Sequence, residues 1–282
     1  MTHFNTYNNQ SFPDFNDNYE IMKELSESDD HEKKKSNVFH KSISKRYLGI
    51  VVETRGLILI TQYNLTDDAE FGYDKHFHLS LNHPNINRMI DFQVYEKYGY
   101  IIEPYGISLN EILKRNPTLS EETWLSIIEV LIDIITYLQE QQIVHFNIET
   151  KNIIFINTNL DDDFDQILTK DNIRESLRLI NFSSARRINL FSNENFHITC
   201  PPSKFLSSKK IESDDKFSLG KMIYESITHK HFSFTDINSM NEDEWKDFPS
   251  VKRIVEDLLK IGHHQRSFTV NVHIFWEFET IE

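Results

Sequence analysis

Two short polar runs hold the side chains with the greatest scope for chemistry. One run is HFNIETKN and the other directly follows an apolar stretch; together they contain His145, Asn147, Glu149, Asn152 and Asn181. Three of these residues are amides. An amide is neutral near pH 7, so it cannot serve as a general base, and it is a weaker Mg²⁺ ligand than a carboxylate oxygen. The residue types therefore argue against general-base catalysis and against strong magnesium binding by these three amides.

Two histidine pairs are the other candidates for chemistry, namely His76 with His78 and His263 with His264. Neither pair has further Cys, His or Asp residues at the spacing of a metal site, so we expect surface or core histidines and no metal. The chain has 7 glycines and no cluster of them. Loops that cradle phosphates with backbone N–H groups usually need such a cluster, so a loop of that kind is not expected.

Strands dominate the first half of the chain, after a polar, Asn-rich stretch at residues 1–18 that is expected to be a disordered tail. Runs of β-branched and aliphatic residues predict strands at 19–25, 49–52, 57–63, 88–94 and 99–103. The second and third of these strands, split by ETRG, predict a hairpin. A mostly polar helix is expected around 67–81.

Helices dominate the second half. Apolar residues recur at helical spacing from Trp124 to Leu138, and Thr118 with Glu121 predicts a capping box at the start of this helix. The other predicted elements are strands at 152–156 and 177–181, an acidic, loop-like insert at about 157–175 between them, and helices from about 214. This order predicts an α+β protein with a small sheet lobe and a larger helical lobe.

Bulk properties narrow the classes of partner. The formal net charge of −14 makes a nucleic-acid backbone an unfavourable partner. No stretch approaches the roughly 20 apolar residues of a membrane helix, so no membrane insertion is expected, and the polar N-terminus does not resemble a signal peptide. The single cysteine, Cys200, excludes a disulfide within the chain and fits a reducing compartment. We therefore expect an intracellular protein, in the cytoplasm, the nucleus or both.

Seven segments resemble, in the correct order, the motifs of the eukaryotic protein kinase family. They are YEIMKEL (19–25) as the first strand, ILITQYNL (58–65) as the lysine strand, HPNI (83–86) as the turn after helix C, YIIE (100–103) as the strand into the hinge, VHFNIETKNII (144–154) as the catalytic loop, LINFS (179–183) at the D-F-G position and DKFSLG (215–220) as the start of helix F. The Gln-x-Asn-Leu ending of the second segment is similar to sterile-group serine/threonine kinases. The resemblance implies a bilobal, protein-kinase-like fold, with a β-rich N-lobe at 19–104 and a helical C-lobe at 105–282.

The reactive positions implied by the resemblance hold residues that depart from the family pattern. The catalytic aspartate aligns with Asn147 and the metal-binding aspartate with Asn181. The lysine that touches the transferring phosphate aligns with Glu149, which reverses the charge. The family asparagine is kept at Asn152, where we expect a structural amide that hydrogen-bonds the loop. The strand lysine aligns with Thr61, whose hydroxyl cannot supply a cation for phosphates.

The nucleotide site implied by the resemblance is also degenerate. The helix-C glutamate aligns with Asp74, which lacks a lysine partner and is expected to be a surface acid. Leu59 replaces a small alanine above the adenine, so we expect an occluded adenine site near Leu59, Ile102 and Ile154, and no cofactor. The glycine loop aligns with residues 26–31, SESDDH, where all three glycines are missing.

Structural positions of the family are filled by compatible residue types. The family stacks side chains between its lobes at the positions of four residues, His145, Phe182, His78 and Ile90. Asp215 falls where a carboxylate anchors the catalytic-loop backbone.

The retained frame and the altered reactive positions together predict a pseudokinase. Such a protein lacks phosphotransfer activity and acts as a protein-binding scaffold or an allosteric regulator of a partner, which could be an active kinase or a signalling complex. Two alternatives stay open. In one, the chain binds nucleotide and performs a residual or atypical nucleotide transfer, with Asp29, Asp30 or Asp74 as metal ligands. In the other, nucleotide binds without turnover and stabilises a fold that recruits partners.

Overall fold

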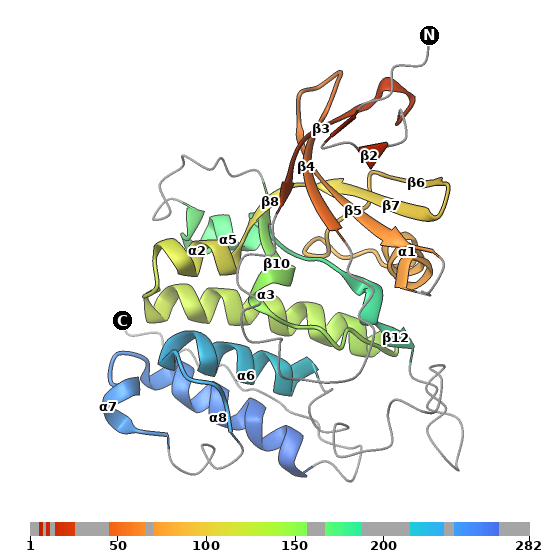
Figure 1. The fold of residues 1–282 in the computed structure, drawn as a ribbon. Coiled ribbons are helices and arrows are strands. Elements are labelled where there is room, and N and C mark those ends of the chain that lie inside the picture. The colour runs from red at the N-terminus through yellow and green to blue at the C-terminus, as the bar shows by residue number, and fades with distance from the viewer. Residues whose placement is uncertain are drawn as a thin grey trace, which may run out of the picture.

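The computed structural model describes residues 6–7, 10–11, 15–25, 45–65, 70–156, 167–187, 215–233 and 240–264. These residues form a β-rich lobe above a larger, mainly helical lobe (Figure 1). The predicted α+β, bilobal architecture is confirmed.

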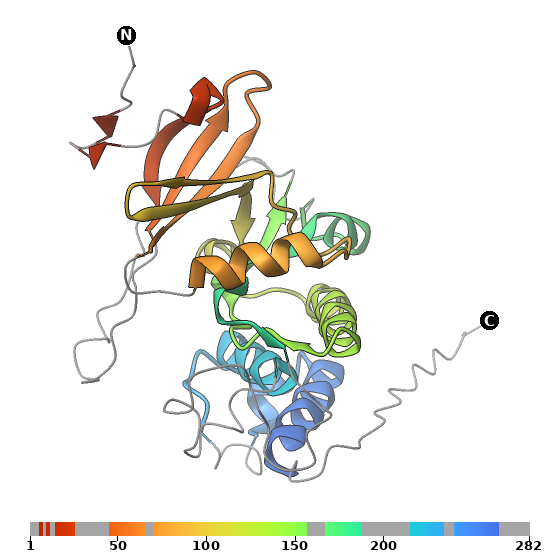
Figure 2. The ribbon, with the colours of Figure 1, turned by 90° about the vertical axis from the view of Figure 1, so that its right-hand side faces the viewer.

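The upper lobe contains a five-stranded antiparallel sheet with the strand order β3-β4-β5-β7-β6. The strands are β3 Tyr19–Leu25, β4 Lys45–Val51, β5 Leu57–Asn64, β6 Asp91–Tyr95 and β7 Tyr98–Pro104. Helix α1, Glu70–Ser80, lies beneath this sheet, between the two lobes (Figure 2). All five predicted strands and the predicted helix are present, because apolar runs bounded by turn residues give a strong sequence signal.

The sheet has two different faces, because successive side chains along a strand point in opposite directions. On the outer face, Ile60 of β5 packs with Tyr100 and Ile102 of β7. On the inner face, Tyr63 of β5 packs with Phe71 of α1. The inner face is therefore the one that looks towards α1 and the helical lobe.

The prediction of a disordered tail is wrong for the described part of residues 1–18. The elements found there are the strand pair β1 Thr6–Tyr7 and β2 Gln10–Ser11, and the 3₁₀ turn η1 Phe15–Asp17. Phe15 is fully buried, with its ring centroid 6.1 Å from that of Tyr19 and 5.6 Å from that of Tyr100. Burying one Phe side chain contributes about 1.5–3 kcal/mol, so a single aromatic residue can hold a polar segment on the sheet.

The lower lobe is built around helix α3, which lies above α6 and α8 in Figure 1. Its elements are β8 Gly106–Ser108, α2 Leu109–Arg115, α3 Glu121–Glu140, β9 Ile143–Val144, η3 Thr150–Asn152, β10 Ile153–Ile156, α5 Lys170–Ser176, β11 Leu177–Leu179, η4 Phe182–Ser184, β12 Arg186–Arg187, α6 Asp215–Thr228, α7 Glu242–Trp245 and α8 Pro249–His264. The apolar stripe predicted for α3 is buried and joins α6 and α8 in one hydrophobic core.

The cap of α3 differs from the prediction. Ser120 is the N-cap, and its Oγ accepts a hydrogen bond from the Thr123 N–H at 3.1 Å, so the predicted capping box of Thr118 and Glu121 is wrong. The Glu121 carboxylate instead accepts a hydrogen bond from the Ser250 N–H at 2.6 Å. Glu121 therefore joins the start of α3 to the start of α8.

Two helices were not expected from the sequence. Helix α2 has a complete capping box formed by Ser108 and Glu111. Helix α5 occupies the last part of the insert at 157–175, which was predicted to be a loop, and Thr169 caps it. Both helices have only 7 residues, too short to show two full turns of apolar periodicity.

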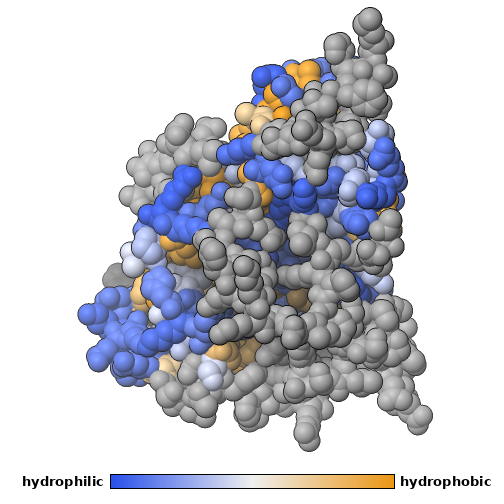
Figure 3. Space-filling model, viewed as in Figure 1, coloured by the Kyte–Doolittle hydropathy of each residue, from blue (hydrophilic) through white to orange (hydrophobic). Residues whose placement is uncertain are grey.

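Several expectations lie outside the described residues. They are the first part of the insert, the glycine-loop alignment at 26–31 with Asp29 and Asp30, and Cys200. The described surface in the view of Figure 1 is largely hydrophilic, with small apolar patches (Figure 3).

Candidate functional site

The β10–β11 hairpin brings the two polar runs together. Ile153 of β10 pairs with Leu179 of β11, so the run that ends at Asn152 lies beside Asn181. The Asn181 Nδ2 donates a hydrogen bond to Asn152 Oδ1 at 3.1 Å. Two apolar strands therefore position the polar residues that the sequence singled out.

Asn152 is fully buried and uses both ends of its amide. Its Nδ2 donates to the Asn147 carbonyl oxygen at 3.0 Å and to Glu149 Oε1 at 3.1 Å, while its Oδ1 accepts from Asn181. Asn152 is thus the loop-binding amide that was predicted. Glu149 also lies 3.1 Å from Lys151 Nζ, so its reversed charge is paired within the same loop.

A cation that the sequence did not reveal reaches this site from the upper lobe. Arg46 of β4 donates from Nη2 to Asn152 Oδ1 at 3.3 Å, which links the two lobes. Arg46 pairs with Thr61 in the β4–β5 ladder. The positive charge that the upper lobe brings to the site therefore comes from β4, because Thr61 of β5 has none. A single arginine at the start of a strand carries no pattern from which this position could have been predicted.

Asp215 anchors the first polar run, as predicted. Its two carboxylate oxygens accept hydrogen bonds from the backbone N–H of His145 at 2.7 Å and of Phe146 at 2.9 Å. His145 is fully buried, and burial lowers the pKa of its imidazole to about 4. The neutral ring accepts from the Asn147 N–H at Nδ1 and donates from Nε2 to the Ile180 carbonyl oxygen. His145 is therefore a structural residue of the loop.

Three of the four residues predicted to stack between the lobes do so. The Phe182 ring lies 4.7 Å from His145 and 5.4 Å from His78, measured between centroids, and both pairs are T-shaped. The prediction for Ile90 is wrong, because its side chain is 47% exposed. Its neighbour Met89 instead packs against the cluster of Tyr63, Phe71 and Ile101 on the inner face of the sheet.

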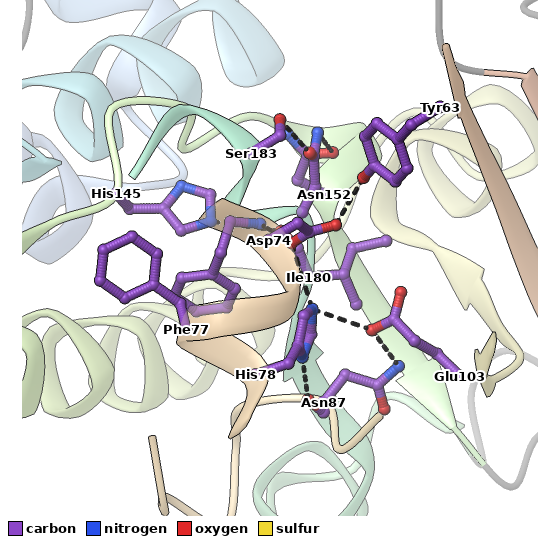
Figure 4. Close-up of polar contacts among 12 residues, drawn as sticks. Tyr63, Asp74, Phe77, His78, Asn87, Glu103, His145, Asn152, Ile180 and Ser183 are labelled. Atoms are coloured by element: carbon purple, nitrogen blue, oxygen red, sulfur yellow. Dashed lines mark hydrogen bonds and ion pairs between the residues drawn. The ribbon is translucent and has the colours of Figure 1, made fainter. Parts of the chain in front are cut away.

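The prediction that Asp74 is a surface acid is also wrong, since Asp74 is 1% exposed. One carboxylate oxygen accepts a hydrogen bond from the Tyr63 hydroxyl at 2.5 Å (Figure 4), and the other accepts one from the Phe182 N–H at 2.6 Å. Tyr63 lies on β5, Asp74 on α1 and Phe182 in η4. This carboxylate therefore ties α1 to the sheet above it and to the lobe below it.

His78 lies between two buried carboxylates. Its Nε2 is 3.3 Å from Asp74 Oδ1 and 3.4 Å from Glu103 Oε1, and its Nδ1 is 3.0 Å from the Asn87 carbonyl oxygen (Figure 4). Burial acts to lower the pKa of His78, but Glu103 and Asp74 raise it to about 9. The ring is therefore an imidazolium at neutral pH, with its Nδ1–H donating to Asn87.

The two carboxylates respond differently to this cation. Burial raises the pKa of Glu103, which has a further hydrogen bond from Asn87 Nδ2 at 3.2 Å. For Asp74, burial acts in the same direction, but the charge of His78 and the hydrogen bonds from Tyr63 and Phe182 lower the pKa overall. Asp74 and His78 thus form the ion pair of the network.

Two of the three residues near which an occluded adenine site was predicted lie in one buried apolar cluster. Leu59, Ile154 and Ile180 form one buried cluster, against which Leu25 and Tyr105 pack. Leu59 of the upper lobe therefore packs in one cluster with Ile154 and Ile180 of the lower lobe. The prediction that Ile102 also lies there is wrong. Ile102 packs in the cluster on the outer face of the sheet, and Glu103 faces inwards in its place.

A groove of about 540 Å³ lies beside the first polar run. Its lining comes from α2, the polar run and α6, and includes Asn110, Phe146, Asn147, Glu149, Lys221 and Glu225. In the described part of the chain, no group of three His, Cys, Asp or Glu residues is placed to hold a metal ion. None of the helices described is both long and apolar enough to cross a bilayer.

The magnesium that kinase-like folds hold at the D-F-G position does not fit the residues present here. The Asn181 Nδ2 donates to Asn152, and the Asn181 Oδ1 accepts from the Ser183 hydroxyl at 2.7 Å. Both ends of the amide are therefore used within the chain, and neither asparagine supplies an anionic oxygen.

Comparisons with known proteins agree with this geometry. Residues 61–272 match the family described as protein kinase domain. The chain is 29% identical over 111 residues to the serine/threonine-protein kinase PrkC of Bacillus subtilis (strain 168), a match that covers 37% of this chain and 17% of that protein. Among solved structures, the autoinhibited serine kinase domain of the giant muscle protein titin is similar with a TM-score of 0.60 and 14% identity, over 88% of this chain and 75% of that one.

Proposed function

This chain belongs to the protein kinase domain family, and from that premise we propose that it is a member that does not transfer phosphate and works by binding another protein. One observation carries the proposal. The amide of Asn181 is bonded to Asn152 and Ser183, and by alignment with the family Asn147 and Asn181 take the places of the carboxylate base and the carboxylate metal ligand.

The chemistry at these positions supports inactivity in two independent ways. Asn147 is neutral and cannot accept the proton of a substrate hydroxyl, and loss of a positioned base costs on the order of 10²–10⁴ in rate. Phosphoryl transfer also depends on metal ions that neutralise the charge on the phosphates. Arg46 is the cation that reaches Asn152, and one cation on one side of the phosphates does not replace a bridging metal ion.

The apolar cluster supports the same conclusion for nucleotide binding. With Leu59 in contact with the cluster of Ile154 and Ile180, an adenine ring would have to displace packed aliphatic side chains. Separating such side chains costs about 25 cal/mol for each Å² of apolar surface returned to water. We therefore expect little affinity for ATP.

The structural contacts that the family shares are present here, and they support a role in which the folded chain serves as a binding surface. Asp215 holds the loop backbone, and Phe182 stacks with His145 and His78. We propose that this frame acts as a scaffold or allosteric regulator of a partner protein, such as an active kinase or a signalling complex, inside the cell.

The test has two parts. In the first, purified protein is incubated with γ-labelled ATP, Mg²⁺ and a general kinase substrate, beside the double variant Asn147→Asp, Asn181→Asp and an active kinase as control. We expect no label above background from the wild-type chain and no thermal shift with ATP at concentrations on the order of 1 mM. Labelling by the wild-type chain that the variant Asn147→Ala abolishes would disprove the proposal.

In the second part, the tagged protein is purified from its own cells, and a partner present in stoichiometric amount is expected.

Atypical nucleotide transfer is the alternative, and the same assay detects it when α-labelled ATP replaces γ-labelled ATP. That reaction needs acids free to bind metal. Asp74, one of the three acids considered for it, is instead bonded to Tyr63, His78 and Phe182. The described residues therefore favour the binding role.

A further inference from the structure

The outer face of the upper sheet carries a buried apolar cluster, although none of the described α-helices contributes to it. An antiparallel sheet with one face on a helix commonly exposes polar residues on the other. Here we call the cluster the outer-face socket and define it by its buried strand residues, Tyr19, Tyr47, Ile58, Ile60, Tyr100 and Ile102. The remaining buried member, Phe15, comes from the turn η1. Phe15 is therefore the described side chain that closes the socket.

Contacts within the sheet give the socket its shape. The Tyr47 hydroxyl donates a hydrogen bond to Gln62 Oε1 at 3.3 Å, and Gln62 Nε2 donates to the Tyr100 hydroxyl at 2.9 Å. The Phe15 side chain has no polar atom and takes no part in these hydrogen bonds. Its ring packs edge-on, with interplanar angles of 74° to Tyr19 and 87° to Tyr100. The strands therefore build the socket, and Phe15 fills it as a ligand fills a preformed site.

One aromatic ring holds this segment on the sheet. Phe15 is fully buried, whereas Asp17 and Asn18 are exposed. Among the described residues, backbone hydrogen bonding to the sheet begins at Asn18, whose carbonyl oxygen accepts from the Val52 N–H at 2.8 Å. The strands β1 and β2 pair with each other in a separate two-stranded sheet. Withdrawal of the Phe15 ring would therefore free the segment before Asn18 without breaking a strand pair of the five-stranded sheet.

The backbone around Phe15 opposes its burial. Phe15 has a φ of 49° and Asp17 a φ of 59°, both in the left-handed region, and the turn η1 that they bound contains no glycine. A bulky side chain is strained at such a φ, because its Cβ comes too close to the following carbonyl oxygen. Strain of this kind persists only while surrounding contacts enforce it, and it is concentrated at ligand clamps and switch regions. Undocking relieves the strain, so the docked state is favoured by less than burial of the ring alone would give.

We propose that the outer-face socket is a docking site for a phenylalanine presented by a turn, that Phe15 is its intramolecular occupant, and that a partner protein displaces Phe15 with a segment of the same chemistry. The chain's own turn, with the sequence FND, shows what the socket accepts. The socket lies on the face of the sheet opposite α1, so its opening depends on the partner and on no ligand between the lobes.

The inference rests on the proposed role in protein binding and names a surface that performs it, together with the contact that keeps this surface closed. Aromatic side chains that fill well-packed pockets contribute most of the binding energy at many protein interfaces. A partner's phenylalanine would make the same ring contacts as Phe15. The two compete for one socket, so binding of the partner requires that Phe15 leave it.

The experiment measures fluorescence anisotropy of a labelled peptide with the sequence of residues 10–18, QSFPDFNDN, added to the full chain. The chain is compared as wild type, Phe15→Leu and Phe15→Ala, a series that shrinks the side chain in the socket step by step. Met22→Ala is the matched control, because it removes an apolar side chain of β3 that is 51% exposed. A second peptide, with alanine in place of Phe15, tests the need for the ring. Far-ultraviolet circular dichroism and the melting temperature verify that each variant folds.

A tethered occupant acts at an effective concentration of about 1 mM. For a peptide that binds Phe15→Ala with a Kd of about 0.1 mM, competition by Phe15 should therefore raise the apparent Kd of the wild-type chain about tenfold. Phe15→Leu, which leaves a smaller side chain in the socket, should lie between the two and keeps the test informative if Phe15→Ala does not fold. Met22→Ala should bind like the wild type, and the alanine peptide should not bind.

The inference is overturned if wild type, Phe15→Leu and Phe15→Ala bind the peptide equally, if none of them binds it, or if the alanine peptide binds as well as the natural one. A wild-type dimer in sedimentation that Phe15→Ala dissociates would also overturn it, because the second occupant of the socket would then be another copy of this chain.

These outcomes are separate from those that test the proposed function. A chain that is inert towards ATP and co-purifies with a partner, yet whose Phe15 variants ignore the peptide, refutes the docking site alone. A chain that transfers phosphate refutes the proposed function, and the peptide measurement can still be read.

Discussion

His78 provides a direct test of the buried network that holds α1, because its imidazolium stands between two carboxylates. A pKa of about 9, against the ordinary value of 6.5, corresponds to about 3 kcal/mol of stabilisation by the protonated ring. The folded state binds this proton more tightly than the unfolded chain. The stabilisation is therefore fully present below about pH 6.5 and is lost as pH rises through about 9.

The slope of stability against pH follows from the same proton linkage. Between about pH 6.5 and pH 9 the native state holds one more proton than the unfolded state at His78, so its contribution falls by about 1.4 kcal/mol for each pH unit. The groups that face His78 are Asp74 on its own helix and Glu103 on β7, with Tyr63 on β5 bonded to Asp74. Burial and Asp74 raise the pKa of Tyr63 well above its usual range, so Tyr63 stays neutral in this window.

The assay is urea unfolding of the wild-type chain and of His78→Asn at several pH values between 6 and 9.5. Asparagine is neutral throughout, so the difference in unfolding free energy between the two proteins should shrink by about 3 kcal/mol across the range. His76→Asn, which replaces an exposed histidine on the same helix, is the matched control and should leave the pH dependence unchanged.

Loss of His78 leaves two carboxylates without their cation, which costs about 3–5 kcal/mol and could prevent folding. Glu103→Gln then serves as the second variant. It removes one of the two charges that raise the pKa of His78, so the loss of stability should begin at lower pH. A free-energy difference between wild type and His78→Asn that stays constant from pH 6 to 9.5, or a Glu103→Gln profile identical to wild type, would show that His78 is not the cation of this network.

Three further substitutions test the packing, each by urea unfolding at pH 7. Gly72→Ala should stabilise the chain by about 0.5–1 kcal/mol, because the added Cβ meets no atom within 4 Å and alanine favours a helix; an unchanged or lower stability would contradict the open space seen there. Gly220→Ala, its matched counterpart on α6, should destabilise by about 1–3 kcal/mol, because the Cβ would stand 2.9 Å from the Cβ of Leu258, and a gain in stability would refute this close approach of α6 and α8. Tyr63→Phe should cost about 1–3 kcal/mol by leaving the buried Asp74 carboxylate with one donor fewer, and a neutral effect would mean that this hydrogen bond contributes nothing.

The sequence sufficed for the five strands of the upper sheet, for α1 and α3, and for the positions of the two polar runs, but not for the short helices α2 and α5. Strands and the long helix α3 were found because their apolar residues repeat with the period of the element over many residues. Asn147, Asn152, Asn181 and Asp215 were located because they stand in ordered motifs. The similarity to sterile-group kinases and the absence of a cofactor stay predictions.

Two of the errors at the site share a physical cause. Ile102 was placed at the inner face of the sheet and Ile90 between the lobes, whereas it is their neighbours Glu103 and Met89 whose side chains point inwards. A shift of one residue along an extended segment moves every side chain to the opposite face. An alignment can therefore place the motifs in the correct order and still assign a side chain to the wrong face.

The buried network could not have been found from spacing at all. Its members come from β5, α1, the turn before β6, β7 and η4, and only the fold brings them together. Asp74 was taken as a surface acid because the lysine that would partner it is absent. The partner is supplied instead by His78, one turn later on the same helix, and by Tyr63, two residues beyond Thr61 on β5.

This substitution of partners bears on the proposed role. In the family pattern the helix carboxylate is paired with a lysine that also binds phosphates, so the position of the helix depends on the site where nucleotide binds. Here Asp74 bonds Tyr63 above and the Phe182 N–H below, and neither group has a charge to offer a phosphate. The helix is therefore fixed by contacts that need no ligand. A chain whose α1 is held in this way keeps the same arrangement of its two lobes whether or not nucleotide is present, which is what a constitutive binding role requires.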